Sequence, residues 1–474
     1  MLRKWNFEIQ LDERSDQAIY LQIADAIIKG IHSGRLKPGD ALPGSRNFSQ
    51  QLKVNRNTVV QALQVLTIEG WLISKERKGT FVADTALPDQ QENPSSAVRD
   101  AELKSTVGRH LHLHIDDGHP NSKIAPITEL ARAYRQIFNQ KARWQMMGYG
   151  HELGDLEFRK TVAQMLNHQR AMQTDEQHIC ITRGSQMAMY LTAQCLFEEG
   201  DHMMIENPGY KPAWAAFEHA GVTLLPVGVD QQGLIVDEVL AHLESGKTIK
   251  AIYVTPHRQY PTTATLSLKR RLQLIRLANA YGFTIIEDDY DNEFHFGYRP
   301  VLPLSSFAEL KNYVYIGTMS KVVAPALRIG YLTSSDRSLI EKVGRLRKII
   351  DVQGDSIMEQ AVLQLIKDGT LKRHIKKATL YYKSKRDLTA RLLKKHIQDK
   401  ATYTTPEGGL AFWIVPKNEV NWSQISKKLQ RKGIKIITPD SYSFGPTVHG
   451  IRLGYGSLSP EQLEESITAL ATVL

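Results

Sequence analysis

The apolar positions near the start of the chain are spaced as they are in short helices. Isoleucine recurs at every fourth position between residues 18 and 32, which puts these side chains on one face of a helix. The four are Ile19, Ile23, Ile27 and Ile31. The turn-rich stretch SGRLKPGDALPGSR then separates this helix from the next one.

The following residues predict two more helices joined by a tight turn. Ser45 can cap a short helix that runs to Leu52, because its hydroxyl can accept a hydrogen bond from a free amide at the helix start. After the turn Val54-Asn55, a third helix is predicted over residues 56–69, with three apolar side chains facing inward. These are Val59, Leu63 and Leu66. Two such helices form a helix-turn-helix, whose second helix enters the major groove of DNA.

A hairpin is predicted directly after the third helix. Apolar residues at 71–74 and at Phe81-Val82 read as two short strands on either side of the basic tip at 75–80. A hairpin in this place is the wing of a winged helix-turn-helix. We therefore predict a compact N-terminal unit over residues 1–83.

The pattern changes at Asp84. Residues 84–110 are polar, contain Pro88 and Pro94 and lack apolar periodicity, which predicts a linker. Beyond it, apolar runs alternate with helix-like segments, the rhythm of an α/β domain with a mostly parallel sheet. The runs are HICIT (178–182), HMMIE (202–206), IKAIYVT (249–255), FTIIEDD (283–289) and YVYIGT (313–318). The predicted domain spans 111–474, with a large part at about 150–350 and a small part from about 351.

Composition narrows the class of protein only in part. The chain has 474 residues, 42% of them hydrophobic, and contains no apolar run long enough for a membrane span. Its first residues lack the apolar core of a secretion signal. Cys180 and Cys195 are too few for a disulfide framework or a metal site. These features favour a cytoplasmic protein without a metal, and the net charge of +10 suits a polyanionic partner.

Positive charge gathers where the helix-turn-helix and wing are predicted. Six cations lie between residues 46 and 83, against two acids. The cations are Arg46, Lys53, Arg56, Lys75, Arg77 and Lys78. This concentration suits a phosphate backbone, although a small helical domain with a solvated basic face would also show it.

The motifs SGRLKPGDALPGSR, VNRNTVVQALQVLTIEGWL and KGTFV resemble the winged helix of the GntR superfamily. The resemblance implies binding to double-stranded operator DNA. It places the DNA-contacting residues at Arg46, Asn55, Arg56, Asn57 and Thr58, and in the wing at Arg77, Lys78 and Gly79. Arginine can read guanine edges with two hydrogen bonds, whereas hydroxyl and amide groups more often fix the position on the backbone.

One segment of the C-terminal domain indicates a cofactor. Lys321 ends the run YIGTMSK after a predicted strand, and Arg328 follows seven residues later. Pyridoxal 5'-phosphate (PLP) needs an amine for a Schiff base, a cation for its phosphate and an acid opposite its pyridine nitrogen. Lys321, Arg328 and Asp288 can supply these three groups. Singly, each cation would be read as a surface residue.

Residues at the ends of other strands complete this set. Asp288 and Tyr290 end the run IIEDDY, where Tyr290 would hydrogen-bond the 3'-oxygen of the ring. Residues Gly184, Ser185 and Gln186 begin a helix, whose free amides can bind the phosphate. Thr318 and Ser320 are close enough in sequence to Lys321 to join the phosphate cradle. Tyr210, after a turn, would cover the ring.

Together these segments resemble the fold-type I aminotransferases, and the whole chain resembles the MocR family, which joins a GntR-type winged helix to such a domain. The resemblance implies that Tyr149 reaches the phosphate in the neighbouring subunit, and hence a domain-swapped homodimer. It also implies that Arg452 holds the α-carboxylate of a substrate or effector, for which a guanidinium is suited.

The chain departs from the family pattern in four places. Residues 149–154 lack the usual Asp-Pro, and Thr263 stands where a PTG motif has glycine. The segment PHRQYP shifts the histidine of the common SHQFP pattern to His257 and adds Arg258. Members that respond to γ-aminobutyrate have a further arginine at about the position of Pro212. We therefore do not infer that effector.

A basic stretch at 372–395 holds ten cations and one acid, Asp387. The cations are Lys372, Arg373, Lys376, Lys377, Lys383, Lys385, Arg386, Arg391, Lys394 and Lys395. A solvated helix face is the ordinary interpretation. The alternative is a surface that touches DNA beside the operator half-sites.

The sequence leaves three hypotheses about function. The first is a PLP-dependent transcription regulator in which PLP or a PLP–amino acid adduct shifts the dimer between conformations with different DNA affinity. The second is a working aminotransferase that carries a DNA-binding module. The third is a structural DNA-bridging dimer with an inactive cofactor site, which the complete set of cofactor residues disfavours. We favour the first, because a winged helix has no role in transamination.

Overall fold

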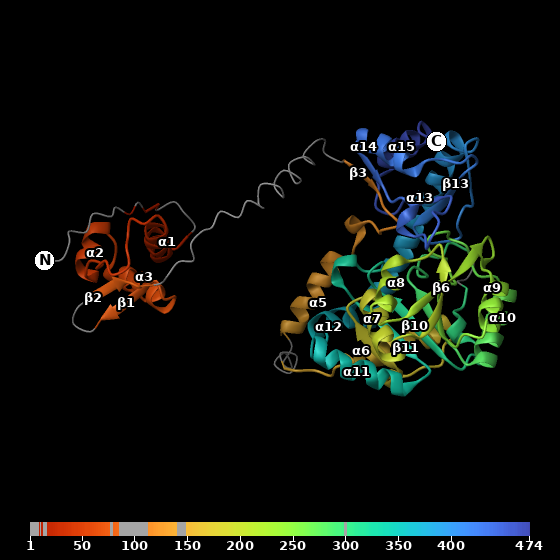
Figure 1. Cartoon of the computed structure of the whole chain (residues 1–474), viewed down its shortest axis with the longest axis horizontal. Coiled ribbons are helices and arrows are strands. Elements are labelled where there is room, and N and C mark those ends of the chain that lie inside the picture. Colours follow the sequence, from red (N-terminus) through yellow and green to blue (C-terminus); the bar gives the residue numbers. More distant parts are fainter. Residues whose placement is uncertain are drawn as a thin grey trace. The chain divides into compact units, whose positions relative to one another are not determined.

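The computed structural model describes residues 9, 11–12, 17–75, 79–84, 112–139, 148–297 and 301–474. The chain divides into two compact units, Met1–Thr106 and Val107–Leu474 (Figure 1). Apart from Asp84, the predicted linker at 84–110 lies outside the described residues.

The N-terminal unit contains the predicted three helices and hairpin. The helices are α1 (Ile19–His32), α2 (Ser45–Leu52) and α3 (Arg56–Ile68), and the strands are β1 (Leu72–Lys75) and β2 (Gly79–Val82). The two strands pair antiparallel, with Leu72 opposite Val82. Side chains of all three helices meet the hairpin in one core, which includes Ile27, Phe48, Val59, Leu66 and Leu72. The predicted winged helix-turn-helix is confirmed.

Three details of this unit differ from the sequence prediction. Ile19 is 38% exposed, because a spacing of four residues advances about 40° beyond a full helical turn at each step. In α3, Ala62 is buried and Leu63 lies at the edge of the core for the same reason. Ser45 is the first helical residue rather than the cap. Gly44 precedes it and makes no side-chain capping bond.

The larger unit is built on an eight-stranded sheet with the order β4-β11-β10-β9-β8-β5-β6-β7. The strands are β4 (Ile179–Thr182), β5 (His202–Asn207), β6 (Thr223–Asp230), β7 (Gly233–Leu234), β8 (Ile249–Val254), β9 (Thr284–Asp289), β10 (Tyr313–Thr318) and β11 (Gly330–Ser334). The pairs from β10 through β9, β8 and β5 to β6 are parallel, whereas β11 and β7 run antiparallel to their neighbours. The apolar runs predicted as strands, and the mostly parallel sheet, are confirmed.

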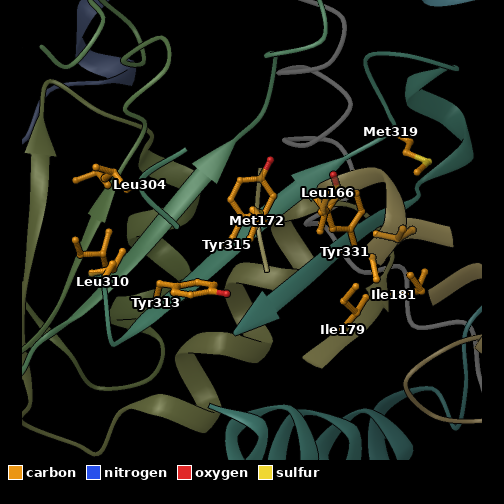
Figure 2. Close-up of a cluster of buried hydrophobic side chains, with 14 of the residues drawn as sticks. Leu166, Met172, Ile179, Ile181, Leu304, Leu310, Tyr313, Tyr315, Met319 and Tyr331 are labelled. Atoms are coloured by element: carbon orange, nitrogen blue, oxygen red, sulfur yellow. The ribbon is translucent and has the colours of Figure 1, made fainter. Parts of the chain in front are cut away.

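Alternate residues of each strand point to opposite faces, and helices cover both faces. In β8, Ile252 belongs to one core and Tyr253 to the other. The first core also receives α5 (Ile127–Asn139), α6 (Leu156–Arg170), α9 (Val236–Glu244), α10 (Leu268–Tyr281) and α12 (Ser356–Lys367). The second receives α7 (Ser185–Leu196), α8 (Lys211–Glu218) and α11 (Arg337–Ile350). Figure 2 shows Tyr315 and Tyr331 on adjacent strands within the first core, with ring centroids 6.4 Å apart.

A third core forms the small part of this unit. Strands β12 (Ala401–Tyr403), β13 (Ala411–Pro416) and β15 (Ile451–Gly454) make an antiparallel sheet, and β14 (Ile434–Ile436) pairs in parallel with β3 (Leu113–Ile115). Its helices are α13 (Thr370–His396), α14 (Trp422–Arg431) and α15 (Pro460–Ala471). The residues after β3 therefore pass from the small part toward the edge of the large sheet. The predicted start of the small part, near residue 351, lies before α12, whose apolar side chains pack in the first core.

Candidate functional site

The start of helix α3 is exposed and capped. Lys53 adopts a left-handed conformation with φ of 52° and ends α2, so the chain turns sharply before α3. The Asn55 side chain then accepts a hydrogen bond from the Asn57 amide at 2.9 Å, which caps α3. Arg56 Nε donates to Ser45 Oγ at 3.3 Å and links the two helices. This geometry presents the first turn of α3 to solvent.

The residues predicted to contact DNA have the exposure that such contacts require. Arg46, Asn55, Arg56 and Asn57 are exposed, and Thr58 is half-buried beside Asn57. In the wing, Gly79 is exposed and has a φ of 111°, a conformation that favours glycine. The predicted wing residues Arg77 and Lys78 lie outside the described residues.

The larger unit contains a cavity of about 200 Å³ at the carboxyl ends of the parallel strands. Its lining brings together most of the predicted cofactor residues from distant segments: Ser185, Tyr210, Asp288, Tyr290, Thr318, Ser320, Lys321 and Arg328. The cavity also contains residues that sequence reasoning missed, which are Asp117, His119, Tyr253, Thr255 and Tyr260. The carboxyl edge of a parallel sheet is where α/β proteins bind ligands.

Lys321 and Asp288 carry the strongest chemical features of this cavity. Lys321 is half-buried after β10, and its Nζ lies 3.1 Å from the Gly118 carbonyl and 4.8 Å from the Tyr290 ring centroid. Burial lowers the pKa of its amine, which favours the nucleophilic neutral form. Asp288 accepts a hydrogen bond from Tyr253 Oη at 2.8 Å, and burial raises its pKa to about 7.

One end of the cavity is suited to an anion. Gly184, with φ of 83°, precedes α7, so Ser185 and Gln186 stand in the first turn of that helix, where amides are free. Arg328 packs against Gly184, and a Cβ there would lie 2.7 Å from its guanidinium. The side-chain Nε2 of Gln186 donates to the Pro212 carbonyl at 2.6 Å, so this side-chain nitrogen is already engaged.

Two buried polar atoms of the cavity lack a partner among the described residues. They are Asp288 Oδ1 and Ser320 Oγ. The neighbouring Thr318 Oγ1 is engaged, since it donates to the Ile329 carbonyl and accepts from the Ser320 amide. Buried polar groups are almost always hydrogen-bonded, so an unpaired carboxylate oxygen and hydroxyl on residues that line a cavity are suited to a polar ligand.

Arg452, on β15 of the small part, has 2% of its surface exposed and contacts two residues of the cavity lining, Asp117 and Tyr290. Its Nε donates to the Asp117 carbonyl at 2.6 Å, Nη1 to the Pro261 carbonyl at 2.9 Å and Nη2 to Tyr290 Oη at 3.2 Å. Tyr290 in turn donates to the Arg258 carbonyl at 2.9 Å. In this state both residues are therefore bonded within the chain, and a ligand carboxylate would have to replace the carbonyls on Arg452.

The aromatic residues of the cavity form one group. The rings of Tyr210 and Tyr260 meet edge to face with centroids 5.2 Å apart, and Tyr260 also lies 6.3 Å from Tyr290. Burial raises the pKa of Tyr210 to about 12, which keeps its hydroxyl protonated. Tyr260 was missed because its run, PHRQYP, holds no regular pattern. Asp117 and His119 could have been found as polar residues that directly follow a short apolar run.

Tyr149 lies away from this cavity and is 91% exposed. It lines a separate hollow of about 420 Å³ with its neighbours Gly150 and His151 and with Gln353 and Glu359. Within one chain, therefore, the structure does not bring Tyr149 to the phosphate end described above.

The departures from the family pattern have structural counterparts. Thr263 has a φ of 64°, the left-handed region that a glycine adopts without strain. His257 is buried and lies 3.5 Å from Asp289, behind the sheet edge, and burial lowers its pKa to about 4. Arg258 is buried too, where it pairs with Asp291 Oδ1 at 3.3 Å and donates to the Phe294 carbonyl.

The predicted basic stretch forms most of α13, but two of its ten cations do not face solvent. Lys385 is buried and its Nζ donates to the Gly456 carbonyl at 2.6 Å. Arg386 donates to the Pro406 carbonyl at 2.8 Å and stacks on Phe296. A solvated face therefore describes the other eight, which are exposed. No described helix is long and apolar enough to cross a membrane.

Comparisons with protein families match the two units separately. The family described as "Bacterial regulatory proteins, gntR family" matches residues 19–82. The family described as "Aspartate amino-transferase" matches residues 186–474, which is more than half of the chain.

Individual relatives cover the whole chain or its larger unit. The probable rhizopine catabolism regulatory protein MocR of Rhizobium meliloti is 26% identical over 97% of this chain and 94% of its own length. The aromatic-amino-acid aminotransferase 1 of Thermococcus litoralis is 27% identical over 79% of this chain and 90% of its own. The solved structure of the α-aminoadipate aminotransferase LysN from Thermus thermophilus, complexed with N-(5'-phosphopyridoxyl)-L-leucine, has a TM-score of 0.70 at 23% identity over 76% of this chain and 92% of its own.

Proposed function

The chain belongs to the MocR-type transcription regulators, which join a gntR-family helix-turn-helix to an aminotransferase-fold domain, and we propose that its larger unit binds PLP and senses PLP or a PLP–amino acid adduct. The smaller unit binds operator DNA in this proposal. The observation that carries it is the cavity that gathers Lys321, Asp288 and Arg328 in a chain that also exposes the start of α3.

The cavity residues suit PLP in kind and in number. Arg328, Ser185, Thr318 and Ser320, with the amides that begin α7, would hold the phosphate. Asp288 would accept from the pyridine nitrogen through Oδ1, which lacks a partner among the described residues. A proton shared there suits a carboxyl group whose pKa burial raises to about 7. Tyr210 would cover one face of the ring.

PLP supplies an aldehyde that condenses with amines and a ring that accepts electrons. Lys321 would provide the attaching amine, and its lowered pKa makes the neutral form available. Arg452 would bind the carboxylate of an incoming amino acid after exchanging its bonds to the Asp117 and Pro261 carbonyls. That exchange links ligand binding to the position of β15 and of the segment after β3, because Arg452 joins the two.

A homodimer completes this proposal. Tyr149 is exposed and lies outside the cavity of its own chain, so it is available to the phosphate end of a second copy. Two DNA-binding units in one dimer would read two half-sites, as is usual for helix-turn-helix proteins. A ligand that binds one dimer conformation more tightly would increase the population of that conformation. The affinity for DNA would then change, because the two conformations bind DNA differently.

A working aminotransferase is the second candidate. Its support is the same set of side chains, because Lys321 and Asp288 line one cavity and Arg452 bonds to the carbonyl of Asp117 in that lining. Under this alternative the DNA-binding unit would be an additional module. The two proposals differ in one measurable respect, because a sensor binds an amino acid in stoichiometric amount, whereas an enzyme converts it repeatedly.

The test uses the purified full chain with PLP. We expect a visible absorbance band from the attached cofactor that Lys321→Ala abolishes. Lys311→Ala, which removes an exposed lysine near the start of β10, serves as the matched control and should keep the band. A mobility shift on the DNA upstream of the chain's own gene should change when PLP or an amino acid is added.

Two results would contradict the proposal in different ways. Absence of any cofactor band in the wild-type chain would remove both the sensor and the enzyme. A normal band with repeated conversion of an amino acid, and DNA binding that is indifferent to every ligand, would favour the enzyme over the sensor.

A further inference from the structure

The cavity contains one charged group that the proposed function leaves without a task. Its described lining holds two acids, Asp117 and Asp288, and two basic side chains, Lys321 and Arg328. PLP would engage Asp288, Lys321 and Arg328. Asp117 remains, on the segment between β3 and the large sheet, where it lines the cavity with its side chain 22% exposed.

The Asp117 carboxylate is held in a fixed position and is ionised. Its Oδ2 accepts a hydrogen bond from Tyr260 Oη at 2.9 Å, and its Oδ1 lies 3.3 Å from His119 Nε2. Although burial opposes ionisation, the nearby charges of Lys321 and Arg452 and the Tyr260 hydrogen bond lower its pKa overall. A carboxylate offers about four acceptor positions. The two contacts use part of this number, so the carboxylate keeps acceptor capacity.

Among the described cations near Asp117, none remains free to pair with a second carboxylate of a ligand. Arg452 would take one carboxylate, and its side chain already donates to the main-chain carbonyl of Asp117. Arg258 is committed to Asp291 and to the Phe294 carbonyl. Among the described residues of this lining, a second carboxylate would meet Asp117 and be repelled, whereas a second ammonium group would be attracted.

From this placement we propose that Asp117 selects an effector that carries a second ammonium group in addition to the amine that reacts with PLP. The ligand class is a diamine or a diamino acid. Asp117 would bind the distal ammonium group, and, in a diamino acid, Arg452 would bind the carboxylate. This inference rests on the proposed function, because it assumes PLP in the same cavity.

The first experiment uses matched ligand pairs on the wild-type, PLP-loaded chain. Ornithine is compared with norvaline, lysine with norleucine, and putrescine with butylamine, since each pair differs only in the distal amine. Dissociation constants come from the change in cofactor absorbance and from calorimetry. We expect the ligand with the distal amine to bind about 10-fold to 100-fold more tightly than its partner in each pair. This is the range that one charge-assisted hydrogen bond contributes. Glutamate should bind more weakly than norvaline.

The second experiment removes the charge. Asp117→Asn keeps an acceptor for Tyr260 but should abolish the preference within each pair, and Asp117→Glu should restore part of it. Glu419→Gln, an exposed change of the same charge in the loop before α14, should leave the preference unchanged. The cofactor band of each variant shows that its cavity is folded and loaded. All titrations contain EDTA, because Asp116, Asp117 and His119 hold ligand atoms within 4.8 Å of one another and could bind a divalent cation.

The outcomes separate this inference from the proposed function. A normal cofactor band with equal binding within the pairs, a preference that survives in Asp117→Asn, or tighter binding of glutamate would overturn the role of Asp117 alone. A missing cofactor band in the wild-type chain would overturn the proposed function and this inference together. If the preference is present, tighter binding of ornithine than of putrescine identifies a diamino acid held by Arg452, and equal binding identifies a diamine.

Discussion

The two candidate sites differ in how their residues are brought together. In the N-terminal unit, Asn55, Arg56 and Asn57 are consecutive, and one turn with one cap places all three at the surface. In the cavity, the segment holding Asp117 and the strands that end near Asp288 and Lys321 are far apart in sequence. The first site depends on local geometry, whereas the second depends on the whole sheet and on the small part of the domain.

The two sites also differ in their electrostatic environment. In the larger unit, burial raises the pKa of Asp288 and of the neighbouring Glu206 to about 7. The start of α3 instead presents its polar groups to solvent. Burial of the Asp288 carboxyl group therefore lowers stability at neutral pH, whereas the first turn of α3 keeps its polar groups solvated.

The largest expected effect tests this cost at Asp288. Its pKa in the folded chain is about 7, above its ordinary value of 3.8, so the folded state retains a proton that the unfolded state releases between about pH 4 and 7. The free energy of unfolding therefore falls as pH rises through this window. Asp288→Asn removes the ionising group, and we expect the cofactor-free variant to gain roughly 2–4 kcal/mol at pH 8 and little at pH 4.

Urea unfolding of the cofactor-free full chain at the two pH values measures this gain. Tyr253 can still donate to the amide oxygen in the variant, so its hydrogen bond is not a confounding loss. Glu419→Gln is the exposed control. A gain of the same size at both pH values would show that the buried charge is not its source.

The next effect tests the local site. Arg56→Ala should weaken binding to the upstream DNA about 10-fold to 100-fold, or 1–3 kcal/mol, because an arginine at the start of a recognition helix is suited to base contacts. The cofactor band should not change. Mobility shifts at one fixed salt concentration measure the loss, with Arg35→Ala, an exposed change between α1 and α2, as the control. Equal losses in both variants would indicate a general charge effect.

A smaller effect concerns backbone strain beside the cavity. Thr263 has a φ of 64°, a left-handed conformation that costs a branched residue about 1–2 kcal/mol. Glycine removes this strain, but part of the gain in stability is lost because the unfolded chain has more backbone entropy with glycine. Thr263→Gly should therefore raise the free energy of unfolding by about 0.5–1 kcal/mol in urea titrations. The neighbouring Thr262→Gly should lower it instead, because Thr262 Oγ1 donates to Gln259 Oε1 at 2.6 Å. A destabilised Thr263→Gly would refute the strain argument.

The smallest expected effect concerns the basic face of α13. If its exposed cations are only solvated, replacing Lys376, Lys383 and Lys394 with glutamate should leave the salt dependence of DNA binding unchanged. Each phosphate contact that is lost would instead reduce the slope of log affinity against log salt by about 0.9. A reduced slope would assign this face to DNA and extend the nucleic-acid interface beyond the winged helix.

Local features of the fold could be predicted from the sequence. Hydrophobic spacing and turn residues predicted α1, α2, α3 and the hairpin, because each depends on residues within a few positions of one another. Apolar runs predicted β4, β5, β8, β9 and β10, whose residues are buried on both faces. Most of the residues proposed to hold the cofactor line one cavity, as expected, because the carboxyl ends of parallel strands meet at one edge of the sheet.

Other features depended on contacts between distant segments. The sequence predicts that Lys385 and Arg386 belong to a solvated basic face. In the structure both are buried and donate hydrogen bonds to main-chain carbonyls of the small part. Arg452 was predicted to face a carboxylate, but whether its donors are free depends on the Asp117 and Pro261 carbonyls. The sequence did not predict that Tyr253 and Asp117 would line the cavity, because the hydrogen-bond partners of a residue depend on which distant segments meet it.

The sequence by itself therefore determined the two-unit organisation, the winged helix and the set of cofactor-type residues around Lys321. The tertiary structure decided which charges remain available once those residues are engaged. The physical reason is that periodicity and turn chemistry act over a few residues, whereas burial and charge pairing act between elements far apart in the chain. Asp117 is an example, because its sequence position after β3 predicts no role, whereas its place in the cavity beside Tyr260 makes it the group proposed to select the ligand.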